Sequence, residues 1–108
     1  MAACNFQKKD GQKPDENRFT PVVLTAEGDF DEPMSFEVLK DGKVFISERK
    51  GNLKVYDPIT KMVSIVGTIP VNTKYTSAEG VVSEAEEGFM GFTVDPNFEK
   101  NHFAYLYY

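Results

Sequence analysis

From residue 19 onward, hydrophobic residues occur in short runs rich in Val, Ile, Phe and Tyr, separated by Gly, Pro, Asp and Asn. Such runs between turn residues are typical of short β-strands. The runs expected to form strands share this pattern and cover residues 19–25, 35–39, 44–48, 53–56, 62–69, 89–94 and 103–108. Helical periodicity is weak, and only the Glu-rich residues 83–87 are expected to form a turn of helix. The predicted fold class is therefore all-β.

Tight turns are expected between the four strands from residue 35 to residue 69. Asp41-Gly42 tolerates the positive φ that a hairpin turn requires. Gly51 and Asp57-Pro58 mark the next two turns. Four strands joined in this way form an up-and-down antiparallel sheet, which is the shape of one β-propeller blade. Because a small sheet exposes two faces, we expect it to stack on other sheets.

The chain divides into two expected parts. Residues 1–18 are mostly polar from residue 5 onward and bury too little apolar surface to offset the entropy of ordering, which predicts a disordered tether. Residues 19–108 are expected to be an incomplete propeller, with a first blade at residues 34–70 and the start of a second at residues 88–108. An end made of the aromatic run at residues 103–108 predicts a fragment, because such a strand invites edge pairing.

Charge and composition narrow the classes of partner. The chain has 17 acidic and 12 basic residues, a formal net charge of −5. An acidic chain repels phosphate backbones, so nucleic acid is not an expected partner. No apolar run is long enough to span a bilayer. A single Cys excludes an intrachain disulfide and a Cys-based metal site.

That cysteine, Cys4, follows Met1-Ala2-Ala3 and precedes a polar stretch. The pattern resembles the end of a bacterial lipoprotein signal, in which the Cys becomes the new N-terminus and carries lipid. On this interpretation the protein is exported, to the periplasm or to an outer membrane that it contacts only through the lipid anchor. The alternative is a free cysteine in a disordered tail.

No catalytic residue and no metal ligand are predicted within the chain. It has no recognisable Ser-His-Asp set, no Gly-rich phosphate loop and no histidine cluster. The one histidine, His102, stands at the junction of a turn and an aromatic run and is interpreted as a surface or packing residue rather than a base.

A long acidic connection at residues 74–88 is the segment most suited to a site. It carries four glutamates, Glu79, Glu84, Glu86 and Glu87. Long loops in compact β-folds often carry function, and this one leads into the inner strand of the second blade, near the expected central channel. A carboxylate there is able to accept hydrogen bonds from a sugar hydroxyl or a cofactor. The alternative is a solvated acidic loop.

Two segments resemble one protein family. Residues 44–57 (VFISERKGNLKVYD) resemble the "vxxTERxGxLxxxD" opening blade of the glucose/sorbosone-type sugar dehydrogenases that depend on pyrroloquinoline quinone (PQQ). Residues 86–108 (EEGFMGFTVDPNFEKNHFAYLYY) resemble that family's "GGLLGLAxDPDFxxNxxxYLYY" segment. The motifs occur in the family's order and together cover most of residues 33–108. The insertion at residues 73–88 is similar to a subgroup of Bacteroidetes-type exported proteins.

The resemblance implies a six-bladed propeller with the quinone over its central channel. It implies oxidation of a sugar hydroxyl, with hydride passing to the quinone, a histidine as base and calcium as Lewis acid. The implied partners are a sugar and an electron acceptor. In the family the base, the cofactor-clamping residues and the calcium ligands follow the stretch matched here, so the fragment alone is expected to be inactive and to bind neither PQQ nor calcium.

The resemblance also assigns roles to individual residues. Glu86 stands where the family often has Gln or Glu, near cofactor and substrate, and is the candidate binding residue; Glu87 is a weaker one. Arg49 matches the Arg of the Thr-Glu-Arg motif, with Ser47 where Thr is usual. Glu48 and Arg49 are expected to be structural, pairing across the top of the blade.

Two other functions remain open at the level of sequence. One is a propeller that binds carbohydrate or protein without catalysis, because the Glu86-Glu87 pair replaces a commonly neutral pair. The other is a small complete lipid-anchored β-protein with a buried last strand.

Overall fold

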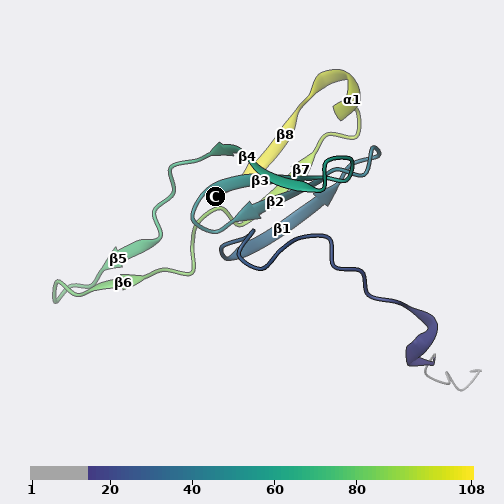
Figure 1. Ribbon diagram of the computed structural model, residues 1–108. Helices are drawn as coiled ribbons and strands as arrows, with labels where there is room; N and C mark the ends of the chain where they lie inside the picture. The colour runs from purple at the N-terminus through teal and green to yellow at the C-terminus, as the bar shows by residue number, and fades with distance from the viewer. Residues whose placement is uncertain (1–14) are drawn as a thin grey trace, which may run out of the picture.

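A computed structural model describes residues 15–108 of the chain. Its main element is a four-stranded antiparallel sheet in which each strand pairs with the next along the sequence (Figure 1). The strands are β1 (Pro33–Val38), β2 (Val44–Glu48), β3 (Asn52–Asp57) and β4 (Met62–Thr68). This sheet, called blade one below, confirms the predicted up-and-down arrangement.

Two glycines allow the tight turns of blade one. Gly42 has φ +86° in the β1–β2 turn, where the Leu39 N–H donates to the Lys43 carbonyl oxygen at 2.8 Å. Gly51 has φ +104° in the β2–β3 turn, and a Cβ there would overlap the carbonyl oxygen of Ile69. The chain leaving β4 therefore approaches this turn more closely than any side-chain-bearing residue would allow.

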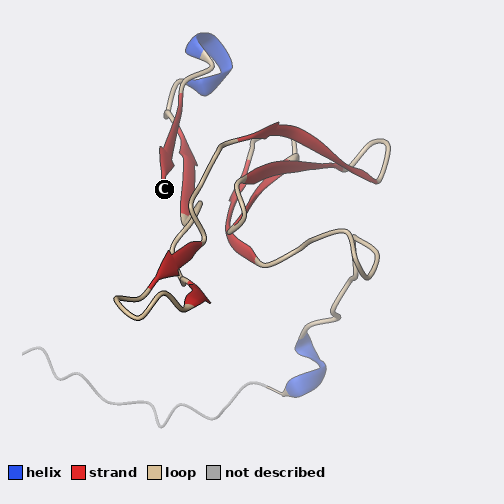
Figure 2. Ribbon diagram, turned by 90° about the vertical axis from the view of Figure 1, so that its left-hand side faces the viewer, coloured by secondary structure: helices blue, strands red, loops and turns tan. Residues whose placement is uncertain are grey.

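A second sheet begins beside blade one (Figure 2). It consists of β7 (Gly91–Val94) and β8 (Ala104–Tyr107), paired antiparallel. The Phe92 N–H donates to Ser35 Oγ at 3.1 Å, and Thr93 Oγ1 donates to Glu37 Oε2 at 3.0 Å. β7 thus lies along β1 in the same direction, as the inner strands of neighbouring propeller blades do.

Side chains alternate between the two faces of blade one. Toward the second sheet, the Phe45 ring packs on Phe92 with centroids 5.3 Å apart. Toward the other face point Ile46 and Tyr56, which are buried, and Phe36, which is 69% exposed. A groove of about 580 Å³ lies between part of that face and residues 22–25, which line its other side. Blade one therefore has one covered face and one largely open face.

Residues 19–25 form no strand, so that prediction is wrong. Phe19, Val22 and Val23 are exposed, and no strand of the described chain pairs with them. Pro21 lacks the N–H that a paired strand would need. Residues 16–18, expected to be disordered, form the single 3-10 turn η1 (Glu16–Arg18). Cys4 and the remainder of the predicted tether lie outside the described residues.

The long connection after β4 contains a hairpin instead of the predicted loop and helical turn. It is formed by β5 (Lys74–Thr76) and β6 (Val82–Glu84), joined by a turn in which Gly80 has φ +82°. Lys74 stands opposite Glu84 in the register. Cross-strand pairing of this kind outweighs the helical preference of the Glu-rich stretch, because neighbouring Val81 and Val82 favour strands.

One further element departs from prediction. The turn at Asp95 continues into a single helical turn, α1 (Phe98–Asn101), before β8. The Asp95 carboxylate accepts hydrogen bonds from the Asn97 N–H at 2.8 Å and from Asn101 Nδ2 at 3.0 Å. These bonds hold the helical turn closed. Within residues 15–108, no helix has the length and apolarity needed to cross a membrane.

Candidate functional site

The β2–β3 turn of blade one receives both ends of the long connection. The Ile69 N–H donates to the Gly51 carbonyl oxygen at 2.8 Å, where the connection begins. The Phe89 N–H donates to the Arg49 carbonyl oxygen at 2.9 Å, where it ends. The Arg49 N–H in turn donates to the carbonyl oxygen of Glu32, just before β1. One turn therefore fixes the entry to β1, the exit from β4 and the entry to β7.

The Arg49 side chain, in a residue that is 9% exposed, joins these segments a second time. Its Nε and Nη2 donate to the Glu32 carboxylate at 3.0–3.2 Å, and Nη2 also reaches Glu84 at 3.3 Å. Its Nη1 donates to the carbonyl oxygens of Ala85 at 2.6 Å and Glu87 at 3.5 Å. The planar guanidinium suits this set, because it presents several donors in fixed directions. We call these contacts the Arg49 clamp.

The contacts of the Arg49 clamp shift the pKa values of the groups that form it. The hydrogen bond to Glu32 is the largest effect and raises the pKa of Arg49. Burial opposes this rise, and the hydrogen bond to Glu84 adds to it. The hydrogen bond from Arg49 in turn lowers the pKa of the Glu32 carboxyl. Both partners therefore stay charged over a wider pH range than free side chains would.

Gly88 lets the connection approach the clamp. Its φ is +149°, and a Cβ at this position would overlap the carbonyl oxygen of Arg49. The next residue, Phe89, is 0% exposed and anchors the entry to β7 in the core. Gly88, the first glycine of the motif at residues 86–108, is thus required by the close backbone contact with Arg49 that joins the two sheets.

Glu48 is a buried carboxylate, 1% exposed, with its own set of partners. It accepts hydrogen bonds from the Asp31 N–H at 2.7 Å and Asn52 Nδ2 at 3.0 Å, and pairs with Lys54 Nζ at 2.7 Å. Burial raises the pKa of Glu48, but the hydrogen bonds from Lys54, Asp31 and Asn52 outweigh burial and leave it lowered. Glu48 and Arg49 are therefore both paired, but not with each other, which corrects the expected pairing.

Glu86 and Glu87 lie at the end of the connection, directly before Gly88. Both are exposed. Across residues 15–108, neither carboxylate has a hydrogen-bond or ion-pair partner. Glu86 stands between Ala85 and Glu87, whose carbonyl oxygens both accept from Arg49. The structure thus presents an unpaired carboxylate on a backbone that is held on both sides.

The chain was compared with known proteins. The family model described as "Glucose / Sorbosone dehydrogenase" matches residues 30–108, which include blade one, the clamp and the second sheet. The chain belongs to this family. Comparison with curated proteins returned no match, and comparison with solved structures returned none either.

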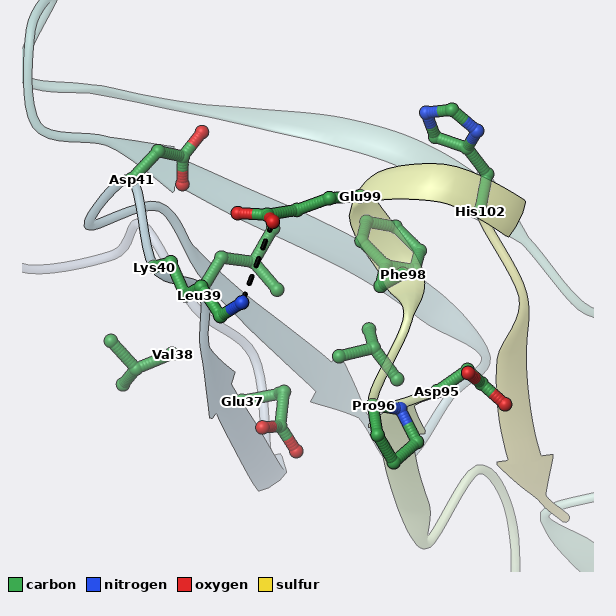
Figure 3. A pocket seen from close by; sticks show the side chains of 11 residues that line it. Glu37, Val38, Leu39, Lys40, Asp41, Asp95, Pro96, Phe98, Glu99 and His102 are labelled. Carbon is green, nitrogen blue, oxygen red and sulfur yellow. Dashed lines mark hydrogen bonds and ion pairs between the residues drawn. The ribbon is translucent and has the colours of Figure 1, made fainter.

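A second cavity of this glucose/sorbosone dehydrogenase family member lies at the end of β1 away from the clamp, near the β1–β2 turn. It measures about 390 Å³ and is lined by Val38, Leu39 and Phe98, among others. Figure 3 shows Glu99 reaching across it toward Lys40, with an Nζ–Oε2 distance of 3.4 Å. Its carboxylates are already engaged by neighbouring groups, as Glu37 is by Thr93.

His102 lines this second cavity and not the Arg49 clamp (Figure 3). It closes the C-terminal end of α1 with φ +56°, and its N–H donates to the Phe98 carbonyl oxygen at 2.9 Å. Its ring packs edge-on against Phe98 with centroids 5.8 Å apart. This geometry agrees with the interpretation of His102 as an exposed packing residue.

The sequence motifs single out Arg49, Glu86 and Glu87 in this family member, and the binding roles of Glu86 and Glu87 stay predictions. The motifs do not indicate Glu32 and Glu84 as partners of Arg49. Glu32 lies just before β1, outside both motifs, and only the folded sheet brings it to residue 49. Glu84 belongs to the acidic connection, but its contact with Arg49 depends on the β5–β6 hairpin, which the sequence pattern does not predict. Among residues 15–108, no group of three His, Cys, Asp or Glu side chains is arranged to hold a metal ion.

Proposed function

We propose that this chain is the N-terminal portion of a PQQ-dependent sugar dehydrogenase that oxidises a sugar hydroxyl. Membership of the glucose/sorbosone dehydrogenase family supports dehydrogenase chemistry. One blade with the inner strands of a second beside it supports a propeller. The single observation that carries the proposal is Glu86, an unpaired carboxylate on a clamped backbone, at the position that the family motif associates with substrate and cofactor.

In the proposed reaction Glu86 binds and orients the sugar. A carboxylate accepts hydrogen bonds from two neighbouring hydroxyls, and such charge-assisted bonds are stronger than neutral ones. Holding the reacting carbon in a fixed place lowers the entropic part of the barrier. Glu87 is the weaker candidate for the same contact. Arg49 holds the Glu87 carbonyl oxygen at 3.5 Å, which is looser than its 2.6 Å bond to the carbonyl oxygen of Ala85.

PQQ with calcium is the proposed cofactor, and when bound it supplies the hydride acceptor and a Lewis acid. The described residues do not fit its site by themselves. Glu86 and Glu87 are anionic, as the carboxylates of the quinone are, and residues 15–108 offer no cluster of metal-binding side chains. We therefore assign Glu86 to the sugar and not to the quinone.

The proposed location is outside the cytoplasm, as a lipoprotein anchored through Cys4. The motif Met1-Ala2-Ala3-Cys4 supports this proposal. Metabolic labelling with a fatty acid is expected to mark the wild-type protein and not Cys4→Ala. Equal labelling of the two proteins would contradict lipidation at Cys4.

The experiment that tests the function uses the complete protein encoded by the gene, loaded with PQQ and calcium. We expect it to oxidise an aldose with reduction of an artificial electron acceptor. Glu86→Gln should raise the KM for sugar roughly tenfold, since a neutral amide replaces a charged acceptor. Glu79→Gln, on the hairpin turn, is the matched control and should leave KM unchanged.

The outcome also separates the dehydrogenase from its alternative. Binding of sugar without any turnover in the loaded protein would favour a carbohydrate-binding propeller, for which the replacement of a neutral pair by Glu86-Glu87 is the supporting observation. If Glu86→Gln turns sugar over with an unchanged KM, the protein is a dehydrogenase but Glu86 does not bind its sugar.

A further inference from the structure

We propose that Arg49 is the positioning residue for Glu86, and that it acts by holding the β5–β6 hairpin and the segment after it against blade one. This inference rests on the proposed function of Glu86 as the sugar-binding carboxylate. Arg49 itself is only 9% exposed and contacts the main chain on either side of Glu86, so it acts through the backbone that carries Glu86.

The first argument is the placement of the hydrogen bonds. Nη1 of Arg49 donates to the carbonyl oxygens of the residues before and after Glu86, at 2.6 Å and 3.5 Å. Two residues further along, the Phe89 N–H binds the Arg49 carbonyl oxygen at 2.9 Å. The backbone at residue 86 is thus fixed to the same residue from both sides.

The second argument is the isolation of the hairpin. In Figure 1, β5 and β6 extend away from both sheets. Within residues 15–108, the contact between Glu84 and Arg49 at 3.3 Å is the polar side-chain contact that ties the two hairpin strands to blade one. Loss of that ion pair leaves the two hairpin strands without a side-chain tie to blade one, so the bonds from Arg49 to the Ala85 and Glu87 carbonyl oxygens restrain the segment after β6 alone.

The third argument is that Arg49 is itself rigidly held. The Glu32 carboxylate binds Nε and Nη2 together, which fixes the plane of the guanidinium. A lysine at this position keeps the charge but has a single ammonium group on a flexible side chain. It cannot bind Glu32, Glu84 and the carbonyl oxygens after β6 at the same time. The geometry therefore depends on the guanidinium fork and not on positive charge alone.

The test uses three variants of the complete protein loaded with PQQ and calcium. Arg49→Lys retains the charge and removes the fork. Glu84→Gln neutralises the carboxylate that pairs with Arg49 at 3.3 Å, and with Lys74 across the hairpin at 3.9 Å, and it leaves the pairing of Arg49 with Glu32 intact. This variant covers the case that Arg49→Lys does not fold. Lys50→Gln is the matched control, because Lys50 pairs with Asp31 and Glu32 and has no contact with the hairpin.

Hydrogen exchange is the first readout. We expect faster exchange confined to residues 82–89 in Arg49→Lys and in Glu84→Gln, and an unchanged rate there in Lys50→Gln. This readout is independent of catalysis, so it tests the positioning even if the protein oxidises no sugar. Unchanged exchange at residues 82–89 in both clamp variants would overturn the inference.

Sugar kinetics are the second readout and separate positioning from a merely structural role. Arg49→Lys should lower kcat/KM for sugar about tenfold or more, because displacement of a binding group by a fraction of an ångström weakens orientation. On the Glu86→Gln background the same substitution should add little, since both changes affect one contact. Effects that multiply instead would show that Arg49 does not act through Glu86.

Discussion

The buried carboxylate of Glu48 makes the stability of the β2–β3 turn depend on pH. It accepts hydrogen bonds from Asp31 and Asn52 and pairs with Lys54, so its pKa lies below the usual value of 4.5 in the folded protein. The unfolded chain therefore binds a proton at Glu48 at a higher pH than the folded chain does. The stabilisation is present above the unfolded pKa and is lost as the pH falls through the folded pKa.

Glu48→Gln is expected to destabilise the protein by about 2 kcal/mol at neutral pH, because Lys54 loses its buried partner. The variant should also lose part of the decline in stability below pH 4.5, the usual value for the group. Urea unfolding of both proteins at pH 7 and at acidic pH measures the two effects. A decline of equal size in both proteins would show that Glu48 is not the responsible group.

The sequence by itself indicates only some of the residues around Arg49 and Glu86. The Arg49 and Glu86 positions follow from motifs, but the partners of Arg49 come from Glu32 and Glu84, which are distant in sequence and share no pattern. Likewise, the adjacent positions of Glu48 and Arg49 suggest a pair, whereas Glu48 ends β2 and pairs with Lys54, and Arg49 stands in the turn and pairs with Glu32 and Glu84. Contacts of this kind depend on the packing of segments and not on local composition.

At the scale of elements, prediction succeeded where the partner strand is a sequence neighbour. β1 to β4 are joined by turns that need Gly42 and Gly51, so their pairing is encoded locally. Residues 19–25 have the composition of a strand but no pairing partner in the described chain. Composition indicates how well a segment suits a sheet, and an available edge decides whether it becomes a strand.

The entry to β7 provides a test of how the two sheets are joined. Gly88→Ala is expected to destabilise the protein by about 2 kcal/mol or more, since a Cβ would overlap the carbonyl oxygen of Arg49 and the backbone has φ +149°. Gly28→Ala is the matched control: Gly28 also has positive φ, +88°, but open space around it. Its loss in thermal stability should be smaller.

The difference between the two glycine variants isolates the overlap from the cost of the backbone conformation. Equal losses in melting temperature for Gly88→Ala and Gly28→Ala would mean that the close approach of Gly88 to Arg49 contributes nothing measurable.

At the scale of the whole molecule, blade one has one open apolar face. Phe36 and Ile65 are exposed there, beside the buried Ile46 and Tyr56. Monomeric soluble proteins rarely expose contiguous apolar patches of large area. We therefore expect the 108-residue chain, expressed by itself, to be marginally stable or to aggregate.

Calorimetry of the 108-residue chain with PQQ and calcium tests the assignment of the cofactor site. We expect no rise in melting temperature, because a ligand stabilises only a protein that holds its site. The complete protein is the control and should be stabilised by the same additions. A clear rise for the 108-residue chain would contradict the proposal that the quinone site lies elsewhere.

The anchoring of the long connection at one turn has a consequence for how the family can diversify. Ile69 and Phe89 bind carbonyl oxygens two residues apart, those of Gly51 and Arg49. Codons between these points can be gained or lost without loss of either bond, because the two ends of the segment are held at one turn of blade one. The length of this segment can thus change without moving the turn that joins the two sheets.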